Sequence, residues 1–226
     1  MSFYTSREDK PRWLVKEFPS LFQDARSVLD VGCDRGQLAQ LLPSHIAYTG
    51  IDMNEEADIQ CNLDSGQRLP LSDKSYDLVL CLETLEHLEH IHVVLDELFR
   101  ISSKYILITL PNPLSRIFHS YLRGRKRTQD PEQQKQFGAY MKFYGLPFER
   151  PFDRHRWFFS TDESISFIRY HAEASNWNIK ELRYSLDMKG GFRRYLKFAI
   201  SAFRRKRMYN LFNETTIFLL ERNTTP

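Results

Sequence analysis

The first half of the chain alternates short apolar runs with segments of helical pattern, and this alternation limits the possible folds more than any other feature. Nearly continuous apolar runs are typical of strands that are buried on both faces of a parallel sheet. Strands are expected at SVLDVG, YTGID, ADIQCNL, YDLVLCL and YILITLP, and helices at GQLAQLLP and HIHVVLDELFRIS. The alternation predicts a doubly wound α/β domain with helices on both faces of the sheet.

The second half of the chain is less regular. A helix is expected at DESISFIRYHAEAS, where Thr161 or Asp162 can cap the first turn. Strands are expected at NIKELRYSL and TTIFLLER, with a basic and aromatic stretch of helical character between them. The length of 226 residues and a hydrophobic content of 42% suit a single domain with additions.

Apolar runs, the first residues and the cysteines indicate the cellular compartment in which the protein is expected. No apolar run approaches the roughly 18 residues that a membrane-spanning helix needs, and the first residues, MSFYTSREDKPRW, are charged where a signal peptide is apolar. Cys33, Cys61 and Cys81 are odd in number and lack metal-type spacing, so reduced and largely buried thiols are expected. We therefore expect a cytoplasmic protein.

Charge is distributed unevenly along the chain. Residues 1–110 carry 10 Lys and Arg against 18 Asp and Glu, whereas residues 111–226 carry 22 against 11. This asymmetry predicts that one part handles a cationic or neutral ligand and that the other meets an anionic partner. A well-solvated surface of uneven charge is the alternative.

The run VLDVGCDRGQL places a glycine-containing loop directly after the first expected strand. Ligands of doubly wound sheets bind at the carboxyl ends of the strands, where this loop lies. Gly32 and Gly36 let the backbone turn sharply, and the free N–H groups of the following helix can bind a carboxylate. Asp30 can receive an ammonium, so the loop suits the charged end of an amino acid.

Asp52 ends the second expected strand, where a carboxylate can accept hydrogen bonds from both ribose hydroxyls. The loop lacks the three glycines of the dinucleotide fingerprint, so a nicotinamide or flavin nucleotide fits poorly. An amino acid joined to a nucleoside is a description of S-adenosylmethionine.

Four runs in succession carry a resemblance to a known family. VLDVGCDRGQL, YTGID, LPLSDKSYDLVLCLETLEHL and YILITLPNP resemble the motifs of class I S-adenosylmethionine-dependent methyltransferases of the type 11-like group, over residues 27–112. The resemblance implies a Rossmann-like, seven-stranded, mostly parallel sheet, with TTIFLLER as its antiparallel last strand beside NIKELRYSL. It also implies these cofactor-binding residues: Asp30, Gly32, Asp34 and Gly36 near the methionine part, Asp52 at the ribose, and Met53, Asn62, Leu63, Asp64 and Leu82 nearby.

Asp34 departs from the family pattern, because it stands where the middle glycine usually lies. Aspartate tolerates the left-handed backbone conformation better than most residues, so the turn can persist. Its side chain adds a negative charge near the methionine carboxylate, which Arg35 can offset. If the loop has lost the cofactor, the alternative is a non-catalytic partner protein with the methyltransferase fold.

The run ETLEHLEH supplies candidate catalytic residues after the fourth strand. His87 can remove the proton of a hydroxyl acceptor during in-line methyl transfer, and Glu83 and His155 are further catalytic candidates. The spacing of Glu83, Glu86 and His87 is similar to that in ubiquinone-biosynthesis O-methyltransferases and small-RNA 3′-end methyltransferases, where these side chains bind a divalent cation such as Mg²⁺. His119 or His155 could complete such a shell. A purely structural role for His87 is the alternative.

The run DRHRWFFS surrounds His155 with charged and stacking groups that suit a sugar, a phosphate or a base. These neighbours are Asp153, Arg154, Arg156 and Trp157. A structural aromatic cluster is the alternative reading of Phe158 and Phe159.

The segment 192–212 places Arg and Lys among apolar residues that line one helical face. A basic amphipathic helix can lie on an anionic membrane surface and deliver a lipid-linked acceptor. The same residues could follow a nucleic-acid backbone, with aromatic rings stacking on bases. An ordinary helix packed on the sheet is the third possibility.

These features predict an S-adenosylmethionine-dependent methyltransferase that acts on oxygen of a glycan, lipid-linked or other anionic acceptor, in peripheral contact with the inner membrane face through 192–212. RNA methylation is the alternative. The single methyltransferase domain is expected to comprise an N-terminal helical extension (1–26), a cofactor-binding core (27–112), a lid or insertion (113–160) and a C-terminal half (161–226) with a basic helical insertion (190–212).

Overall fold

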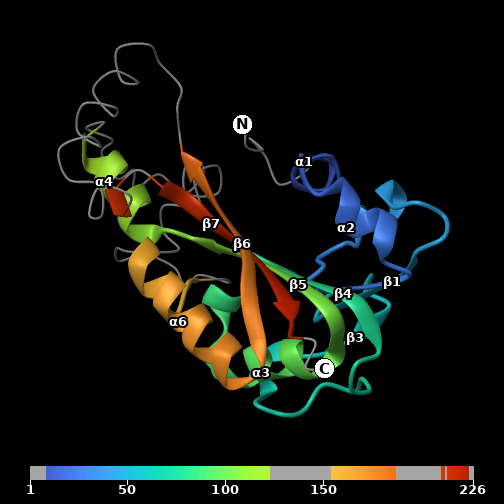
Figure 1. The fold of residues 1–226 in the computed structure, drawn as a ribbon. Helices are drawn as coiled ribbons and strands as arrows, with labels where there is room; N and C mark the ends of the chain where they lie inside the picture. The colour runs from blue at the N-terminus through green and yellow to red at the C-terminus, as the bar shows by residue number, and fades with distance from the viewer. Residues whose placement is uncertain (1–8, 123–153, 187–209, 212, 224–226) are drawn as a thin grey trace.

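A central seven-stranded sheet organises the computed structural model, which describes residues 9–122, 154–186, 210–211 and 213–223 (Figure 1). The strand order is β3-β2-β1-β4-β5-β7-β6. The strands are β1 Ser27–Val31, β2 Ala47–Asp52, β3 Ile59–Gln60, β4 Tyr76–Leu82, β5 Ser102–Pro111, β6 Trp177–Leu186 and β7 Asn213–Arg222.

Strand direction divides the sheet into two parts. The pairs β1–β2, β2–β3, β1–β4 and β4–β5 are parallel. Strand β7 is antiparallel to both β5 and β6, between which it lies. The expectation of a Rossmann-like, mostly parallel α/β sheet with an antiparallel last strand is confirmed.

Helices cover the two faces of this sheet, so that each face has its own apolar core. The helices are α1 Lys10–Glu17, α2 Pro19–Asp24, α3 Ile91–Ile101, α4 Pro113–Leu122 and α6 Thr161–Ala174. On one face, apolar side chains of α3 and α6 pack on β1, β4 and β5. On the other face, Trp13 and Leu14 of α1 and Phe22 of α2 pack on alternate residues of the same strands. Strands buried on both sides explain the continuous apolar runs of the sequence.

Three local expectations were wrong in detail. GQLAQLLP forms a short 3₁₀ helix, Gln37–Leu41, because the chain turns to extended backbone at Leu42 before Pro43, which cannot continue a helix. ADIQCNL contributes only the two residues of β3, since the backbone then enters the turn that Asn62 caps. Ser160 caps α6 in place of Thr161 or Asp162, through a capping box with Glu163.

The two predicted insertions are covered only in part. Helix α4 begins the predicted lid or insertion, and residues 154–160 end it without regular structure. Residues 123–153, which form most of it, lie outside the described residues, as do 187–209 and 212 of the basic segment. In the described part of the chain no helix is both long and apolar enough to cross a bilayer.

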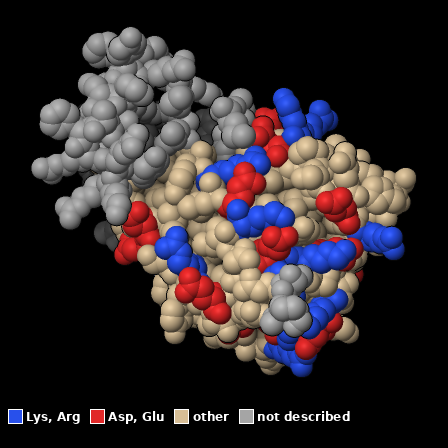
Figure 2. Space-filling view, viewed as in Figure 1, with Lys and Arg blue, Asp and Glu red and all other residues tan. Residues whose placement is uncertain are grey.

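Charges of both signs are interspersed on the face drawn in Figure 2, without a large patch of one sign among the described residues. The cationic clusters that distinguish the second half of the sequence, 123–127 and 193–207, lie outside the described residues. The predicted anionic partner therefore rests on the sequence alone.

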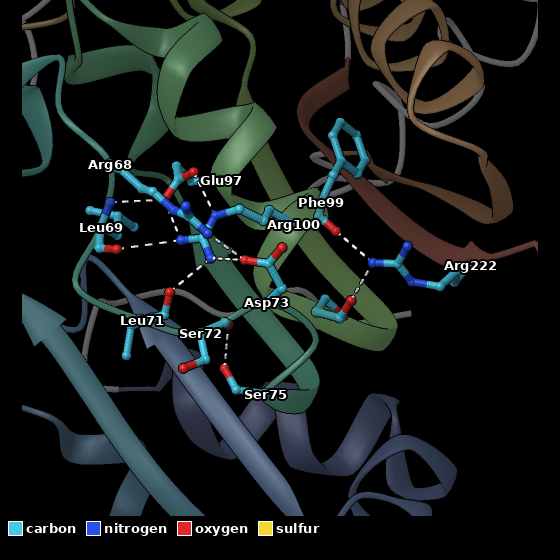
Figure 3. Close-up of polar contacts among 11 residues, drawn as sticks. Arg68, Leu69, Leu71, Ser72, Asp73, Ser75, Glu97, Phe99, Arg100 and Arg222 are labelled. Carbon is cyan, nitrogen blue, oxygen red and sulfur yellow. Dashed lines mark hydrogen bonds and ion pairs between the residues drawn. The ribbon is translucent and has the colours of Figure 1, made fainter.

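A guanidinium on α3 fixes the loop that leads into β4 (Figure 3). Arg100 donates to Glu97, to Asp73 and to the carbonyl oxygen of Leu71, at distances of 2.6 to 2.8 Å. Glu97 in turn accepts from the backbone N–H of Leu69 at 2.8 Å. Burial opposes ionisation of Glu97, but the hydrogen bonds from Arg100 and Leu69 hold the pKa of its carboxyl below the ordinary value. This network joins α3 to the loop that positions β4.

Removing that guanidinium is expected to destabilise the fold. Arg100→Met leaves the carboxylate of Glu97 buried without its cation, so the free energy of unfolding should fall by about 3 kcal/mol. Lys104→Met is the matched control, because Lys104 pairs with Asp77 at 3.3 Å with its own side chain 55% exposed; it should change stability by less than about 0.5 kcal/mol. Urea denaturation measures both, and equal losses in the two variants would contradict the role given to Arg100.

Candidate cofactor-binding and catalytic site

The predicted site residues meet at the carboxyl edge of the parallel strands. In β1, Asp30 is in register with Gly50 of β2 and with Leu80 of β4. Because the three strands run in the same direction, the loops that follow them lie beside one another. Residues that are far apart in the chain therefore border one site.

Gly32 turns the chain where β1 ends. Its φ is +79°, and its N–H donates to the carbonyl oxygen of Ile51 at 2.9 Å. A Cβ at this position would overlap the side chain of Thr84, which follows β4. Only glycine fits, because both the backbone angle and the close approach exclude a side chain. Thr84 was not among the predicted residues.

Asp34 adopts the backbone conformation of the glycine that it replaces. Its φ is +53°, in the left-handed region. Its N–H donates to Asp52 at 3.0 Å, and its carboxylate accepts from the side chain of Asn54 at 3.3 Å. The expectation that aspartate preserves this turn agrees with the geometry, and the side chain points toward β2 rather than across the loop.

Asp52 ties the loops after β1 and β2 together. One of its oxygens accepts the N–H of Asp34, and the other accepts the N–H of Asn54, each at 3.0 Å. Every carboxylate oxygen has a second lone pair, so both can still accept a ribose hydroxyl. Asp52 is in this way positioned for the role that the resemblance implies.

Asp30 is almost completely buried beneath the loop, and the Tyr48 hydroxyl donates to it at 3.1 Å. Burial raises the pKa of Asp30 to about 6, although the hydrogen bond from Tyr48 and the charge of Lys10 oppose the shift. A cationic ligand beside a buried carboxyl group stabilises its ionised form. Tyr48 was missed by sequence analysis, because its role depends on the pairing of β1 with β2.

The predicted adenine contacts differ in exposure. Met53 is 58% exposed directly after β2, whereas Leu63 is buried in the core. Asp64 is engaged, since it accepts from the N–H of His90 at 2.9 Å. Asn62 caps the turn by accepting from the N–H of Asp64 at 2.9 Å, and it is the more exposed of these two polar candidates.

The three cysteines carry no nucleophilic chemistry. All three are free thiols, with Cys81 buried and Cys33 and Cys61 partly buried. Burial and the nearby carboxylates of Asp30 and Asp52 raise the pKa of Cys33 to about 12, so its thiol stays protonated.

The end of β4 meets a lysine from the N-terminal helix. The Lys10 ammonium donates to the carbonyl oxygen of Leu82 at 2.7 Å and lies 3.6 Å from the carboxylate of Glu83. Glu83 has a φ of +56°, which only a tightly constrained turn imposes on this residue type. Lys10 lies 72 residues from Leu82, and nothing in the sequence points to the contact.

Glu86, His87 and His155 form a cluster with one potential ligand atom from each within 4.8 Å of the others. The rings of the two histidines are 4.4 Å apart between centroids, and His87 Nε2 lies 3.7 Å from Glu86 Oε1. Burial raises the pKa of Glu86 to about 7, a shift that His87 opposes and Glu83 strengthens. The other oxygen, Glu86 Oε2, is buried and has no hydrogen-bond partner among the described residues.

Two contacts bring His155 to this cluster. The N–H of Arg156 donates to the carbonyl oxygen of Glu86 at 2.8 Å, and the indole of Trp157 donates to the carbonyl oxygen of Leu88 at 2.7 Å. His155, one of the two histidines considered for completing a metal shell, therefore lies beside His87. Glu83, which was predicted to share a metal with Glu86, is instead ion-paired with Lys10, and the side chain of His119 lies outside the described part of the chain.

Comparisons with known proteins agree with this geometry. Ubiquinone biosynthesis O-methyltransferase from Rickettsia bellii is 26% identical over 132 residues, which are 50% of this chain and 52% of that protein. The chain thus spans about half the length of the curated relatives it matches. A solved S-adenosylmethionine-dependent methyltransferase from Archaeoglobus fulgidus is similar with a TM-score of 0.58 at 16% identity, over 96% of this chain and 95% of that one.

The methyltransferase domain of a bacterial CtHen1 is also similar, with a TM-score of 0.55 at 16% identity over 95% of this chain and 98% of that one. At such identities the likeness shows the fold alone. The family profile described as a methyltransferase domain, by contrast, matches residues 5–166, which is most of the chain. The chain therefore belongs to the methyltransferase domain family.

Proposed function

We propose that this chain is an S-adenosylmethionine-dependent methyltransferase that acts on a hydroxyl oxygen of a glycan, lipid-linked or other anionic acceptor. The observation that carries the proposal is the cluster of Glu86, His87 and His155 at the carboxyl end of β4. A hydroxyl must lose its proton as it accepts a methyl group, and an imidazole can take that proton near neutral pH. The printed name of the relative from Rickettsia bellii, an O-methyltransferase, supports transfer to oxygen.

In this proposal the protein aligns the two reactants and manages one proton. The methyl group of a sulfonium is already activated, so alignment for in-line displacement supplies much of the acceleration. His87 takes the proton of the acceptor hydroxyl, and the carboxylate of Glu86, 3.7 Å away, stabilises the resulting imidazolium. His155, which lies in the segment before α6, places its ring beside that of His87.

We further propose that the same three side chains hold a divalent cation. The fit is favourable, because a buried carboxylate oxygen of Glu86 lacks a hydrogen-bond partner among the described residues and two imidazoles lie beside it. A set of two imidazoles and one carboxylate suits a transition metal better than Mg²⁺, which prefers oxygen ligands, and among transition metals Mn²⁺ suits a carboxylate oxygen. We therefore favour Mn²⁺ over the Mg²⁺ that the sequence pattern suggested. A bound cation would lower the pKa of the acceptor hydroxyl.

The acceptor class rests on the basic sequence of the second half. Segment 192–212 combines cationic and apolar residues at helical spacing, which suits an anionic membrane surface. RNA methylation is the second candidate, because the same charges suit a phosphate backbone.

Cofactor affinity is expected to depend on pH through Asp30. This carboxyl faces Tyr48, Lys10, Asp52 and Cys33, and its raised pKa of about 6 means that it becomes neutral below that pH and no longer attracts the methionine ammonium. S-adenosylhomocysteine should bind about tenfold more weakly at pH 5 than at pH 7. Calorimetric titration measures the change. Asp30→Asn should remove this dependence, and 5′-methylthioadenosine, which lacks the ammonium, should not show it.

Metal binding is expected to depend on the cluster. Glu86→Gln and His155→Ala should each weaken Mn²⁺ binding by about tenfold or more, as measured by electron paramagnetic resonance of the free ion. His45→Ala is the control, because His45 is exposed and remote from the cluster in sequence. If the wild-type protein leaves Mn²⁺ free, the cation proposal fails while the role of His87 as a base stands.

The acceptor class is tested by vesicle flotation and RNA gel shift on the same preparation. Anionic vesicles should carry the protein upward, neutral vesicles should not, and Arg204→Ala combined with Arg207→Ala should reduce the bound fraction by about half or more because each basic residue near the surface contributes about 1 kcal/mol. Methyl groups from labelled S-adenosylmethionine should then appear in the lipid extract. A salt-dependent shift of RNA without vesicle binding would favour the second candidate instead.

A further inference from the structure

Lys10 lies where the structure offers hydrogen-bond acceptors to a cation. Its Nζ donates to the carbonyl oxygen of Leu82 at 2.7 Å and lies 3.6 Å from the carboxylate of Glu83, with its side chain only 15% exposed. Its positive charge also acts on Asp30, beneath the glycine loop. A lysine from the N-terminal helix thus neutralises the acidic end of the site between β1 and β4.

The helix that carries Lys10 is held firmly at its other end. Phe18 follows α1 and is buried, and the guanidinium of Arg183 from β6 lies 4.1 Å from the centroid of its ring. Arg183 also donates to the carbonyl oxygen of Glu17 at 3.2 Å. Trp13 and Leu14 are buried in the core between these points. Because α1 is anchored, Lys10 can leave its acceptors by a rotation of its side chain alone.

The methionine end of the cofactor needs the same acceptors. Asp30 is a predicted neighbour of the methionine part and Leu82 is a predicted cofactor-binding residue, and an ammonium there requires carbonyl or carboxylate oxygens. Two ammonium groups placed at hydrogen-bond distance from one oxygen would repel each other. The two cations cannot both stay.

We propose that Lys10 occupies the ammonium subsite of the cofactor in the free enzyme and is displaced when the cofactor binds. Lys10 keeps the carboxylates of Asp30 and Glu83 compensated while the site is empty of ligand. Displacing Lys10 lowers the affinity only of ligands that carry an ammonium, because other ligands leave Lys10 in place. Lys10 therefore weakens cofactor binding, in contrast to a lysine that pairs with the methionine carboxylate and strengthens it.

Three thioether ligands separate these roles in Lys10→Met. S-adenosylhomocysteine carries ammonium and carboxylate, S-adenosyl-3-thiopropylamine carries the ammonium alone, and 5′-methylthioadenosine carries neither. Displacement predicts that the variant binds the first two ligands about tenfold more tightly than wild type, because a larger fraction of the free protein has an open ammonium subsite. The affinity for the third ligand should be unchanged. Lys16→Met, an exposed lysine on the same helix, should leave all three affinities unchanged.

The opposite pattern would overturn the proposal. Weaker binding of S-adenosylhomocysteine with unchanged binding of the amine would show that Lys10 holds the carboxylate, and unchanged affinities for all three would show that it plays no part. Binding of 5′-methylthioadenosine in every variant confirms that the nucleoside site is folded.

A second measurement uses the wild-type protein. Acetylation of Lys10 by a water-soluble ester, followed by mass spectrometry, should become severalfold faster with saturating S-adenosylhomocysteine, because displacement exposes the amine. It should not change with 5′-methylthioadenosine, and Lys16 should react at a constant rate. Slower acetylation of Lys10 with S-adenosylhomocysteine, or no change, would contradict displacement.

Discussion

The pairing of β1 with β2 on one side and β4 on the other is the constraint on which the rest of the structure depends. Strands β1 and β4 are buried on both faces, so their apolar side chains fix the register. The register brings the loops after the three strands to one edge. The loops after β1 and β4 approach so closely that a Cβ on Gly32 would overlap the side chain of Thr84, so position 32 must be glycine.

The same edge concentrates carboxylates in a poorly solvated place, and two of them have a compensating partner. Tyr48 donates to Asp30, and Lys10 pairs with Glu83. Glu86 is the most buried of the three, and burial raises its pKa to about 7. Unpaired buried charge is costly, so such an edge favours cationic ligands. The ammonium of the proposed cofactor and the proposed divalent cation are both cationic, so they would suit the electrostatics of this edge.

Sequence analysis anticipated the sheet because the information there is local. Apolar runs predicted six of the strands nearly in full, and the tolerance of aspartate for left-handed backbone predicted the turn at Asp34. Sequence analysis missed contacts between segments that are far apart in the chain. The contact of Lys10 with Leu82 joins residues 72 positions apart, and the ion pair of Lys10 with Glu83 accompanies it. A spacing such as E-x-x-E-H fixes neighbours along the chain, but not the direction in which each side chain points.

His155 shows how a residue from the second half of the chain becomes part of the site. The bonds that bring its segment to β4 use the N–H of Arg156 and the indole of Trp157, and neither involves the imidazole itself. Position 155 is therefore held by its neighbours in the chain, which place its ring beside that of His87. Because Trp157 packs near His92 of α3, with ring centroids 6.5 Å apart, that placement depends on the same helix whose Arg100 fixes the loop before β4. Helix α3 thus contacts the segments at both ends of β4, and these contacts help to position the site.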